Sequence, residues 1–180
     1  MLAISQARFY SVKKWEIVGN HGILLHDIHI MFRGVNDLNL DAKGRLSLPA
    51  RYHERVHESC DGSLVITVDV DRCLLIYPFP EWERIEQKLM QLPSINKQVR
   101  RLQRLLLGHA TECEIDGTHR ILLPPPLRHF ASINKHAVLI GQGNKFELWD
   151  QETWAKMCKR WIKEENKLSG IADALETLSI

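Results

Sequence analysis

The sequence predicts a small α+β fold, rich in β-structure and built from a duplicated unit. The first observation is a phrase that occurs twice: residues 41–49 read DAKGRLSLP, and residues 116–124 read DGTHRILLP. Aspartate, arginine and proline recur at the same spacing in the two phrases. The second is that a similar order of short apolar runs and amphipathic segments follows each phrase. Antiparallel strands with segregated helices are typical of the α+β class.

In the first half, residues 31–40 predict a strand, and residues 41–44 predict a turn in which glycine supplies a positive φ. Residues 45–48 alternate polar and apolar, which indicates a half-buried strand. We therefore expect these two strands to pair as a hairpin with Arg45 just past the turn. Proline at the first helical position favours a short helix over residues 50–58. The remaining expected elements of this half are a hairpin from 64–68 and 74–77, a helix through Trp82 and Leu89, and a helix over 96–107.

The second half repeats this order. A strand over 110–115 and a turn at 116–119 come first, and the further elements are a strand at 120–123, a helix starting at 124–126, a hairpin from 138–141 and 145–149, and a helix after Asp150. Its tryptophans and aliphatic residues recur at helical spacing. Residues from 169 onward are acidic, and we expect frayed chain or a short terminal helix there.

We expect three segments: an N-terminal extension (1–30), a first unit with its helices (31–109) and a second unit with a C-terminal helix (110–180). Residues 1–30 lack the pattern of the rest. A signal peptide would need a longer apolar run and a small-residue cleavage site. Three readings stay open: sequence upstream of the true start, a flexible native arm, or an extra element. The first is favoured because organised patterning begins at Met31.

Composition narrows the class of protein without naming a function. A hydrophobic content of 44% and a charged content of 26% are ordinary for a soluble globular protein. A net charge of +2 is too small to indicate nucleic-acid binding unless the basic residues cluster. No apolar run approaches the roughly 20 residues of a membrane span. Four cysteines without a short paired spacing favour reduced thiols and a cytoplasmic protein.

From Met31 onward the sequence resembles the MraZ family of bacterial regulators. The resemblance rests on residues 31–34 (MFRG), 41–49, 74–78 (LLIYP), 101–110 (RLQRLLLGHA) and 141–149 (GQGNKFELW). It covers nearly everything in residues 31–180, and it also supports Met31 as the usual start. It implies an AbrB/SpoVT-like fold, with two tandem swapped-hairpin motifs forming a pseudo-twofold barrel with peripheral helices. It further implies assembly of the chains into a ring-shaped homo-oligomer.

The resemblance also implies a function. Members of the family are encoded at the head of the division and cell-wall gene cluster. The resemblance therefore implies sequence-specific binding to short direct repeats upstream of the protein's own operon. The family motif is fully present in the first copy. The second copy departs at His119, where the family pattern has glycine, which leaves open whether Gly117 carries that turn.

Arg45 and Arg120 are the candidate base readers. A guanidinium can donate two parallel hydrogen bonds to guanine O6 and N7 in the major groove, and a β-hairpin is thin enough to enter that groove. Gly44 would let the backbone approach the duplex closely. The alternative is that each arginine only braces its turn by pairing with Asp41 or Asp116. We interpret both aspartates as structural, through turn bonding or as orienting partners of the arginines.

Other basic residues are candidates for the DNA backbone. Lys43 lies in the first turn and Arg33 near the start of the first expected strand, so both are predicted phosphate contacts, which add affinity without sequence choice. Solvated charge is the favoured interpretation of Arg51 and Arg55. The basic helix face is expected to form ion pairs with glutamates of the preceding helix, across a helix or a subunit contact, with DNA contact as the alternative; it consists of Lys97, Arg100, Arg101 and Arg104.

Enzyme and metal interpretations are weak. Residues 141–145 resemble a phosphate loop only faintly, because the following Ser/Thr and helix are missing. His109 and Cys113 have ligand-like spacing but no second pair nearby, so we predict no metal and no cofactor. We therefore predict a non-enzymatic, nucleoid-associated repressor of its own operon, whose partners are double-stranded promoter DNA and further copies of itself, with no membrane. A ring-forming scaffold without DNA readout is the alternative, and a small hydrolase is the least favoured option.

Overall fold

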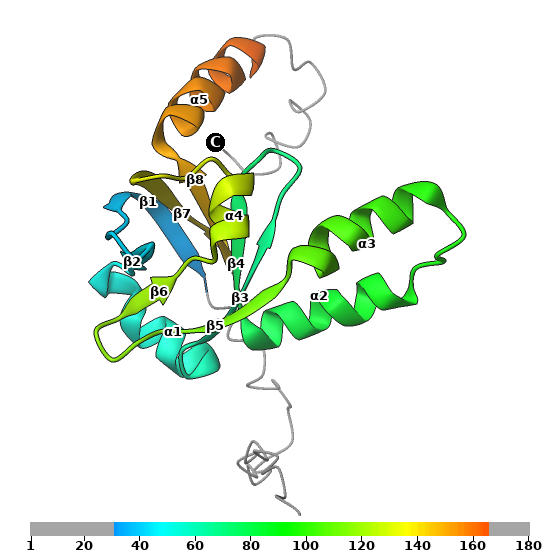
Figure 1. Cartoon of the computed structure of the whole chain (residues 1–180), viewed down its shortest axis with the longest axis horizontal. Coiled ribbons are helices and arrows are strands. Elements are labelled where there is room, and N and C mark those ends of the chain that lie inside the picture. The colour runs from blue at the N-terminus through cyan, green and yellow to red at the C-terminus, as the bar shows by residue number, and fades with distance from the viewer. Residues whose placement is uncertain (1–30, 166–180) are drawn as a thin grey trace, which may run out of the picture.

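The computed structural model describes residues 31–165, which form an α+β fold (Figure 1). The predicted class is therefore confirmed. The first half contains β1 (Phe32–Asn39), β2 (Arg45–Ser47), the 3-10 helix η2 (Ala50–Tyr52), α1 (His53–Cys60), β3 (Ser63–Val68), β4 (Leu74–Pro78), α2 (Phe79–Gln91) and α3 (Lys97–His109). The second half contains β5 (Thr111–Glu114), β6 (Arg120–Leu122), α4 (Pro125–Phe130), β7 (His136–Gly143), β8 (Lys145–Asp150) and α5 (Gln151–Glu165). The expectations for residues 1–30 and from 169 onward lie outside the described residues.

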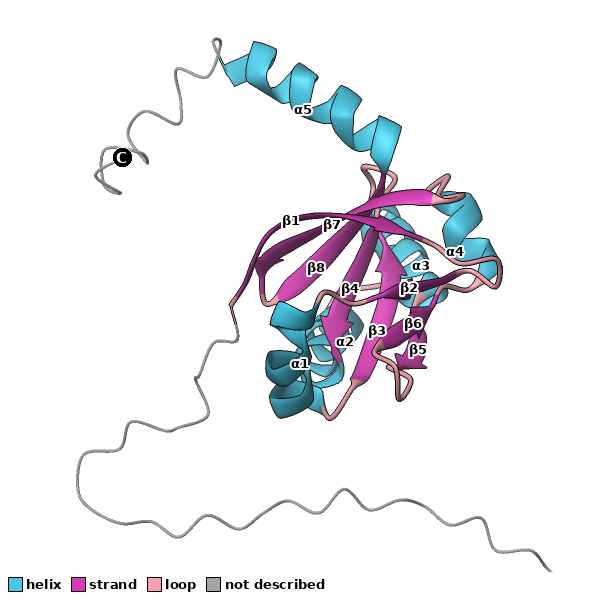
Figure 2. Cartoon of the chain, turned by 90° about the vertical axis from the view of Figure 1, so that its left-hand side faces the viewer, coloured by secondary structure: helices cyan, strands magenta, loops and turns pink. Residues whose placement is uncertain are grey.

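The strands form two antiparallel sheets (Figure 2). The larger sheet has the order β1-β7-β8-β4-β3-β5, and the smaller is the pair β2-β6. The predicted hairpin between residues 31–40 and 45–48 is therefore wrong, because β1 pairs with β7 and β2 pairs with β6. Alternation along a strand fixes which face is buried but does not choose the partner strand.

The two halves exchange strands with each other. The first strand of the first half, β1, pairs with β7 of the second half. The first strand of the second half, β5, pairs with β3 of the first half. The middle strands, β2 and β6, pair with one another. Neither half of about 75 residues has a complete sheet alone, and each buries its apolar strands against the other.

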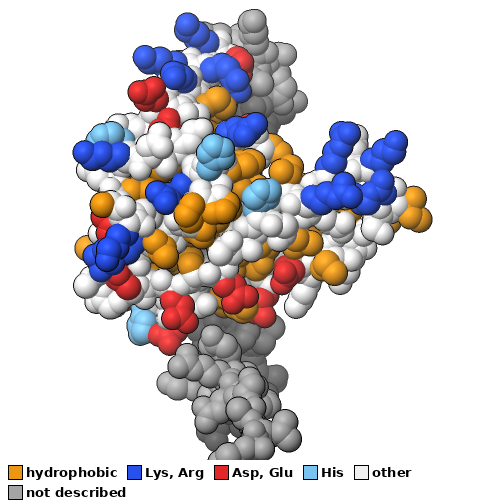
Figure 3. All heavy atoms as spheres, viewed as in Figure 1, with side chains coloured by type: hydrophobic (Ala, Val, Ile, Leu, Met, Phe, Trp, Pro, Cys, Tyr) orange, Lys and Arg blue, Asp and Glu red, His pale blue; other side chains and the backbone are white. Residues whose placement is uncertain are grey.

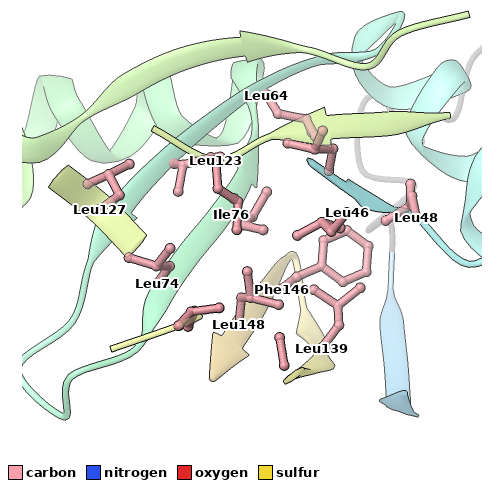
Figure 4. Packing of buried hydrophobic residues seen from close by; sticks show 14 of the residues in the cluster. Leu46, Leu48, Leu64, Leu74, Ile76, Leu123, Leu127, Leu139, Phe146 and Leu148 are labelled. Carbon is pink, nitrogen blue, oxygen red and sulfur yellow. The ribbon is translucent and has the colours of Figure 1, made fainter. Parts of the chain in front are cut away.

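The core lies between the small sheet and one face of the large one. Leu46 of β2 and Ile121 of β6 stand directly opposite each other and are fully buried. Figure 4 shows Leu46, Ile76, Phe146 and Leu148 converging in this core. The aromatic ring of Tyr52 packs there against Phe146, with 4.9 Å between centroids. This packing fixes the position of the β2-β6 pair relative to the rest of the molecule.

A second apolar cluster covers the opposite face of the large sheet. Its buried members include Val65, Tyr77, Trp82 and Trp149, and residues of α2, α3 and α5 pack against them. Helices α2 and α3 extend side by side away from the sheets (Figure 1). Within residues 31–165, no helix is both long enough and apolar enough to cross a membrane.

Replacing Leu46 with Ala should lower the free energy of unfolding by about 2–5 kcal/mol, because it leaves a cavity against Ile121 in the core between the sheets. Leu122→Ala is the matched control: Leu122 lies in the same small sheet but faces solvent, so its effect should stay within about 0.5 kcal/mol. Urea denaturation followed by circular dichroism measures both. Equal effects of the two substitutions would contradict the assigned packing.

A candidate nucleic-acid interface on the small sheet

The first turn is organised by Asp41. Its Oδ1 accepts hydrogen bonds from the backbone N–H groups of Lys43 and Arg45, both at 2.9 Å. Its own N–H donates to the carbonyl of Arg45 at 2.8 Å, and the N–H of Gly44 donates to the Asp41 carbonyl at 2.9 Å. A single carboxylate therefore closes the turn that leads into β2. This bonding is the local use of aspartate that the sequence favours at turns.

The second turn repeats this bonding around Asp116. Its Oδ1 accepts from the backbone N–H groups of Thr118 and Arg120 at 2.9 and 3.0 Å. The hydroxyl of Thr118 donates to the same oxygen at 2.6 Å. The N–H of Asp116 donates to the Arg120 carbonyl at 2.9 Å. The two turns are thus copies of one structure.

Each arginine is held by the aspartate of its own turn. In Arg45, Nε and Nη2 both lie 2.7 Å from Asp41 Oδ2. In Arg120, the same two nitrogens lie 2.9 Å from Asp116 Oδ2. The turn-bracing ion pairs therefore exist, and the two arginine side chains stay 28% and 32% exposed. The pairing occupies the Nε–Nη2 edge of each guanidinium and leaves the Nη1 end outside the ion pair.

The two carboxylates are stabilised in their ionised form. Hydrogen bonding from the backbone and guanidinium of Arg45 lowers the pKa of Asp41 from its ordinary value. The Thr118 hydroxyl, followed by Arg120, lowers the pKa of Asp116 further. Both aspartates are thus negatively charged at neutral pH, and both ion pairs form there.

The register of the small sheet places the two arginines on one surface. Arg45 stands opposite Leu122, and Ser47 stands opposite Arg120. Successive side chains point to opposite faces, so these four residues face outward while the buried pair between them faces the core. Two residues along the strand and one strand across separate the two arginine Cα atoms by about 8 Å. We call this outward face, made of Arg45, Ser47, Arg120 and Leu122, the arginine ribbon.

His119 takes the backbone conformation that glycine has in the first turn. Its φ is 58°, whereas Gly44 has a φ of 79°, and Gly117 is not in the positive-φ region. The interpretation that Gly117 carries the turn is therefore wrong. The His119 ring stacks on His53, with 3.7 Å between centroids and 6° between planes. Histidine thus holds the left-handed conformation with a stacking partner from the other half.

The corresponding position over the first turn is filled by Arg128. A Cβ built on Gly44 would lie 2.7 Å from Arg128 Cζ, so the guanidinium rests directly against this glycine. His53 and Arg128 occupy the same place after the two repeated phrases. Each turn is therefore covered by a residue of the opposite half. Sequence reasoning missed Arg128, although its position in the repeat, matched to His53, was available as a signal.

The other predicted DNA contacts differ in position. Lys43 is exposed in the first turn, beside the arginine ribbon. Arg33 lies inside β1, within the strand expected over residues 31–40. Eight residues separate it from Asp41, or about 25 Å along an extended chain. The structure does not bring Arg33 to the ribbon.

The remaining basic residues make mostly local contacts. Arg51 donates to Asn36 Oδ1 at 2.6 Å, and Arg55 donates to the Met31 carbonyl at 3.1 Å. The basic face of α3 is visible as a cluster in Figure 3. Among residues 31–165, no ion pair joins this face to glutamates of α2: Arg100 instead bonds the carbonyls of Ser94 and Ile95. The expectation of ion pairing across the α2–α3 helix contact is therefore wrong for the described residues, whereas pairing across a subunit contact stays a prediction.

The metal candidates also have other partners. His109 Nδ1 lies 2.9 Å from the Leu105 carbonyl, and burial raises the pKa of Cys113 to about 12. The described residues contain no cluster of three or more potential ligands of the His, Cys, Asp and Glu types.

The fold and the site define a duplicated binding protein, in which two interlocked repeats present their arginine turns on one ribbon. Comparison of the sequence with protein families gives a match to the model of the MraZ protein, which carries an antitoxin-like description. The match occurs twice, over residues 31–105 and 106–175. The chain belongs to the MraZ family of transcriptional regulators. This is a family of regulators and not of enzymes, as the sequence predicts.

Several close relatives are named transcriptional regulator MraZ. The transcriptional regulator MraZ of Thioalkalivibrio sulfidiphilus is 63% identical over 150 residues, which covers 83% of this chain and 100% of the relative. The MraZ regulator of Methylococcus capsulatus is 57% identical over 79% of this chain and 93% of its own length. That of Pseudomonas aeruginosa is 49% identical over 82% of this chain and 99% of its own length.

Gly44→Ala should destabilise the chain by about 1–3 kcal/mol, because alanine resists a positive φ and its Cβ would meet Arg128. In an Arg128→Ala background the steric part disappears, so the same substitution should cost less. Urea denaturation of the four proteins of this double-mutant cycle separates the two causes. Equal costs in both backgrounds would show that Arg128 does not rest on the turn.

Acid should weaken the two turns. Since both aspartates have a pKa that is lower in the folded chain, their stabilising effect is present above the pKa of about 3.9 of an unfolded aspartate. It is lost as the pH falls through the lower folded values. The Asp41→Asn, Asp116→Asn double variant should therefore show a flatter decline in thermal stability below about pH 4 than the natural chain. Parallel declines in the two proteins would contradict the ion-pair assignment.

Proposed function

We propose that this chain is a sequence-specific DNA-binding repressor of its own operon, in the division and cell-wall gene cluster, acting on the nucleoid in the cytoplasm. The observation that carries the proposal is the pair of oriented arginines on the outward face of one two-stranded sheet. The name of its relatives, transcriptional regulator, supports regulation as the purpose of that surface.

The ion pairs are compatible with base reading because they occupy only one edge of each guanidinium. A guanidinium has a side edge, Nε and Nη2, and an end, Nη1 and Nη2. Each aspartate accepts from the side edge. The end can then donate in parallel to guanine O6 and N7, a contact that discriminates against a wrong base by about 1–3 kcal/mol. Asp41 and Asp116 act as orienting residues in this mechanism.

Contacts to phosphate would position the ribbon. Lys43 is the best placed of the predicted residues, because it is exposed in the turn that precedes Arg45. Arg33 can contact only DNA that extends past the ribbon along β1. Such contacts contribute affinity and salt dependence but no sequence choice.

We also propose the assembly that the family resemblance implies. The units 31–109 and 110–180 form two swapped-hairpin motifs in a pseudo-twofold barrel, and several chains form a ring. One ribbon holds DNA weakly, whereas several ribbons on one duplex act through effective concentration. The target is then a set of short G-containing direct repeats about one helical turn, or roughly 10 bp, apart. Occupied repeats that overlap a promoter block polymerase.

Arg45→Ala should weaken binding to the upstream region of the operon by about 5- to 150-fold per ribbon, the range that corresponds to losing one bidentate base contact. Arg55→Ala is the matched control, since Arg55 bonds the backbone of Met31, away from the ribbon. A gel shift with the natural and a scrambled upstream sequence measures both, and size-exclusion chromatography checks the oligomer. Equal binding by the natural chain and the Arg45 variant would refute the role of Arg45.

The scaffold alternative is separated by salt. A DNA reader with several phosphate contacts loses affinity by orders of magnitude between 50 and 200 mM salt. A ring that serves only assembly would retain no DNA at any salt concentration, and that result would favour the scaffold over the repressor.

A further inference from the structure

Helix α5 carries an apolar surface that the described residues leave open. Trp149, Trp154 and Trp161 form a contiguous aromatic cluster, with centroid distances between 5.7 and 5.9 Å. Trp149 is buried, but Trp161 is 37% exposed and its neighbour Ile162 is 67% exposed. A large aromatic side chain half in water at the edge of a core indicates a surface that something else covers.

In the first half, the surface of α2 that corresponds to this surface of α5 is covered by another helix. When the sequences of β4-α2 and β8-α5 are aligned, Trp82 corresponds to Trp154 and Leu89 to Trp161. Leu89 is only 7% exposed. Helix α3 runs beside α2 there, and Gln103 of α3 donates to the Leu89 carbonyl at 2.8 Å. In the second half, no helix within residues 31–165 takes the place of α3.

The same alignment identifies the segment of the second half that corresponds to α3. It matches most of α3, residues 97–108, with residues 169–180. Apolar residues recur in this segment at the spacing of one helix face: Ile171, Ala174, Leu175 and Leu178. Three of these positions match Val99, Leu102 and Leu106 of α3. Residues 166–168 leave a connection of ordinary length for two antiparallel helices.

Charge complementarity supports the same pairing. Helix α2 carries three glutamates and two basic residues, and its partner α3 carries four basic residues and no acidic one, so their net charges are opposite although no ion pair joins them within residues 31–165. In the second half the signs are reversed: α5 has four basic and three acidic residues, whereas residues 169–180 carry Asp173 and Glu176 and no basic residue. Helix α5 and the C-terminal segment thus have opposite charges, as α2 and α3 have.

We propose that residues 169–180 form a helix that docks on the Trp161–Ile162 surface of α5 in the same chain, as α3 docks on α2. The second half then ends in a helical pair like the first. A second copy of the chain is the competing occupant, because Ile95 at the tip of the α2–α3 pair is also exposed.

The test uses the full chain and hydrogen exchange read by mass spectrometry. A Leu175→Asp, Leu178→Asp variant should exchange the amides of residues 154–164 about tenfold faster or more, because the covering helix is lost. Thr177→Asp is the control for added charge: it adds one negative charge, against two in the double variant, outside the apolar face of the segment and should leave the exchange unchanged. Native mass spectrometry of each protein checks that the oligomer is the same.

Three results would overturn the proposal. Unchanged exchange in the double variant would show that the segment does not cover α5. Equal acceleration by Thr177→Asp would show that added charge, and not loss of the apolar face, is the cause. Protection of α5 that falls on dilution of the natural chain, together with loss of the oligomer, would assign the surface to a second copy. None of these measurements involves DNA, so they do not depend on the proposed function.

Discussion

The pairing of β2 with β6 is the constraint on which the rest of the structure depends. It joins the halves through a strand ladder and buries Leu46 against Ile121 in the common core. Because each strand follows its turn directly, the same ladder also fixes where the two turns lie. The carbonyl of His119 accepts from the N–H of Leu48, and the carbonyl of Gly44 accepts from the N–H of Leu123. The contacts that join the two halves therefore also position the two arginines.

Turn bracing and the proposed base reading, the two interpretations of Arg45 and Arg120, are compatible with each other. Free arginine side chains would lose rotamer entropy on binding DNA, and this loss reduces affinity. Here Asp41 and Asp116 have already fixed the guanidinium planes in the free protein. Each ion pair is half exposed, so by itself it adds little to stability. Under the proposed function, its larger effect is to preorganise for base contact the end of the guanidinium that remains available.

Local sequence predicted most elements, because periodicity, prolines and turn residues act over a few positions. It predicted the hairpins β3-β4 and β7-β8 but not the partners of β1 and β2, which both pair across the halves. Arg33 illustrates a second limit, since nearness in sequence to a turn says little once an extended strand intervenes. The positive φ of His119 depends on the chain returning to Asp116 and on the stack with His53, a contact between the halves.

The two turns differ in one respect that bears on DNA recognition. An exact twofold ribbon would present identical ends and would suit an inverted repeat. In this chain one turn has Gly44 beneath the guanidinium of Arg128, and the other has His119 stacked on His53. The glycine–arginine contact at one turn is replaced by a histidine–histidine contact at the other. The backbone of the two turns is alike, but the side chains at the two ends of the ribbon differ. Such a ribbon has a direction, which fits the proposed binding of direct repeats in one orientation.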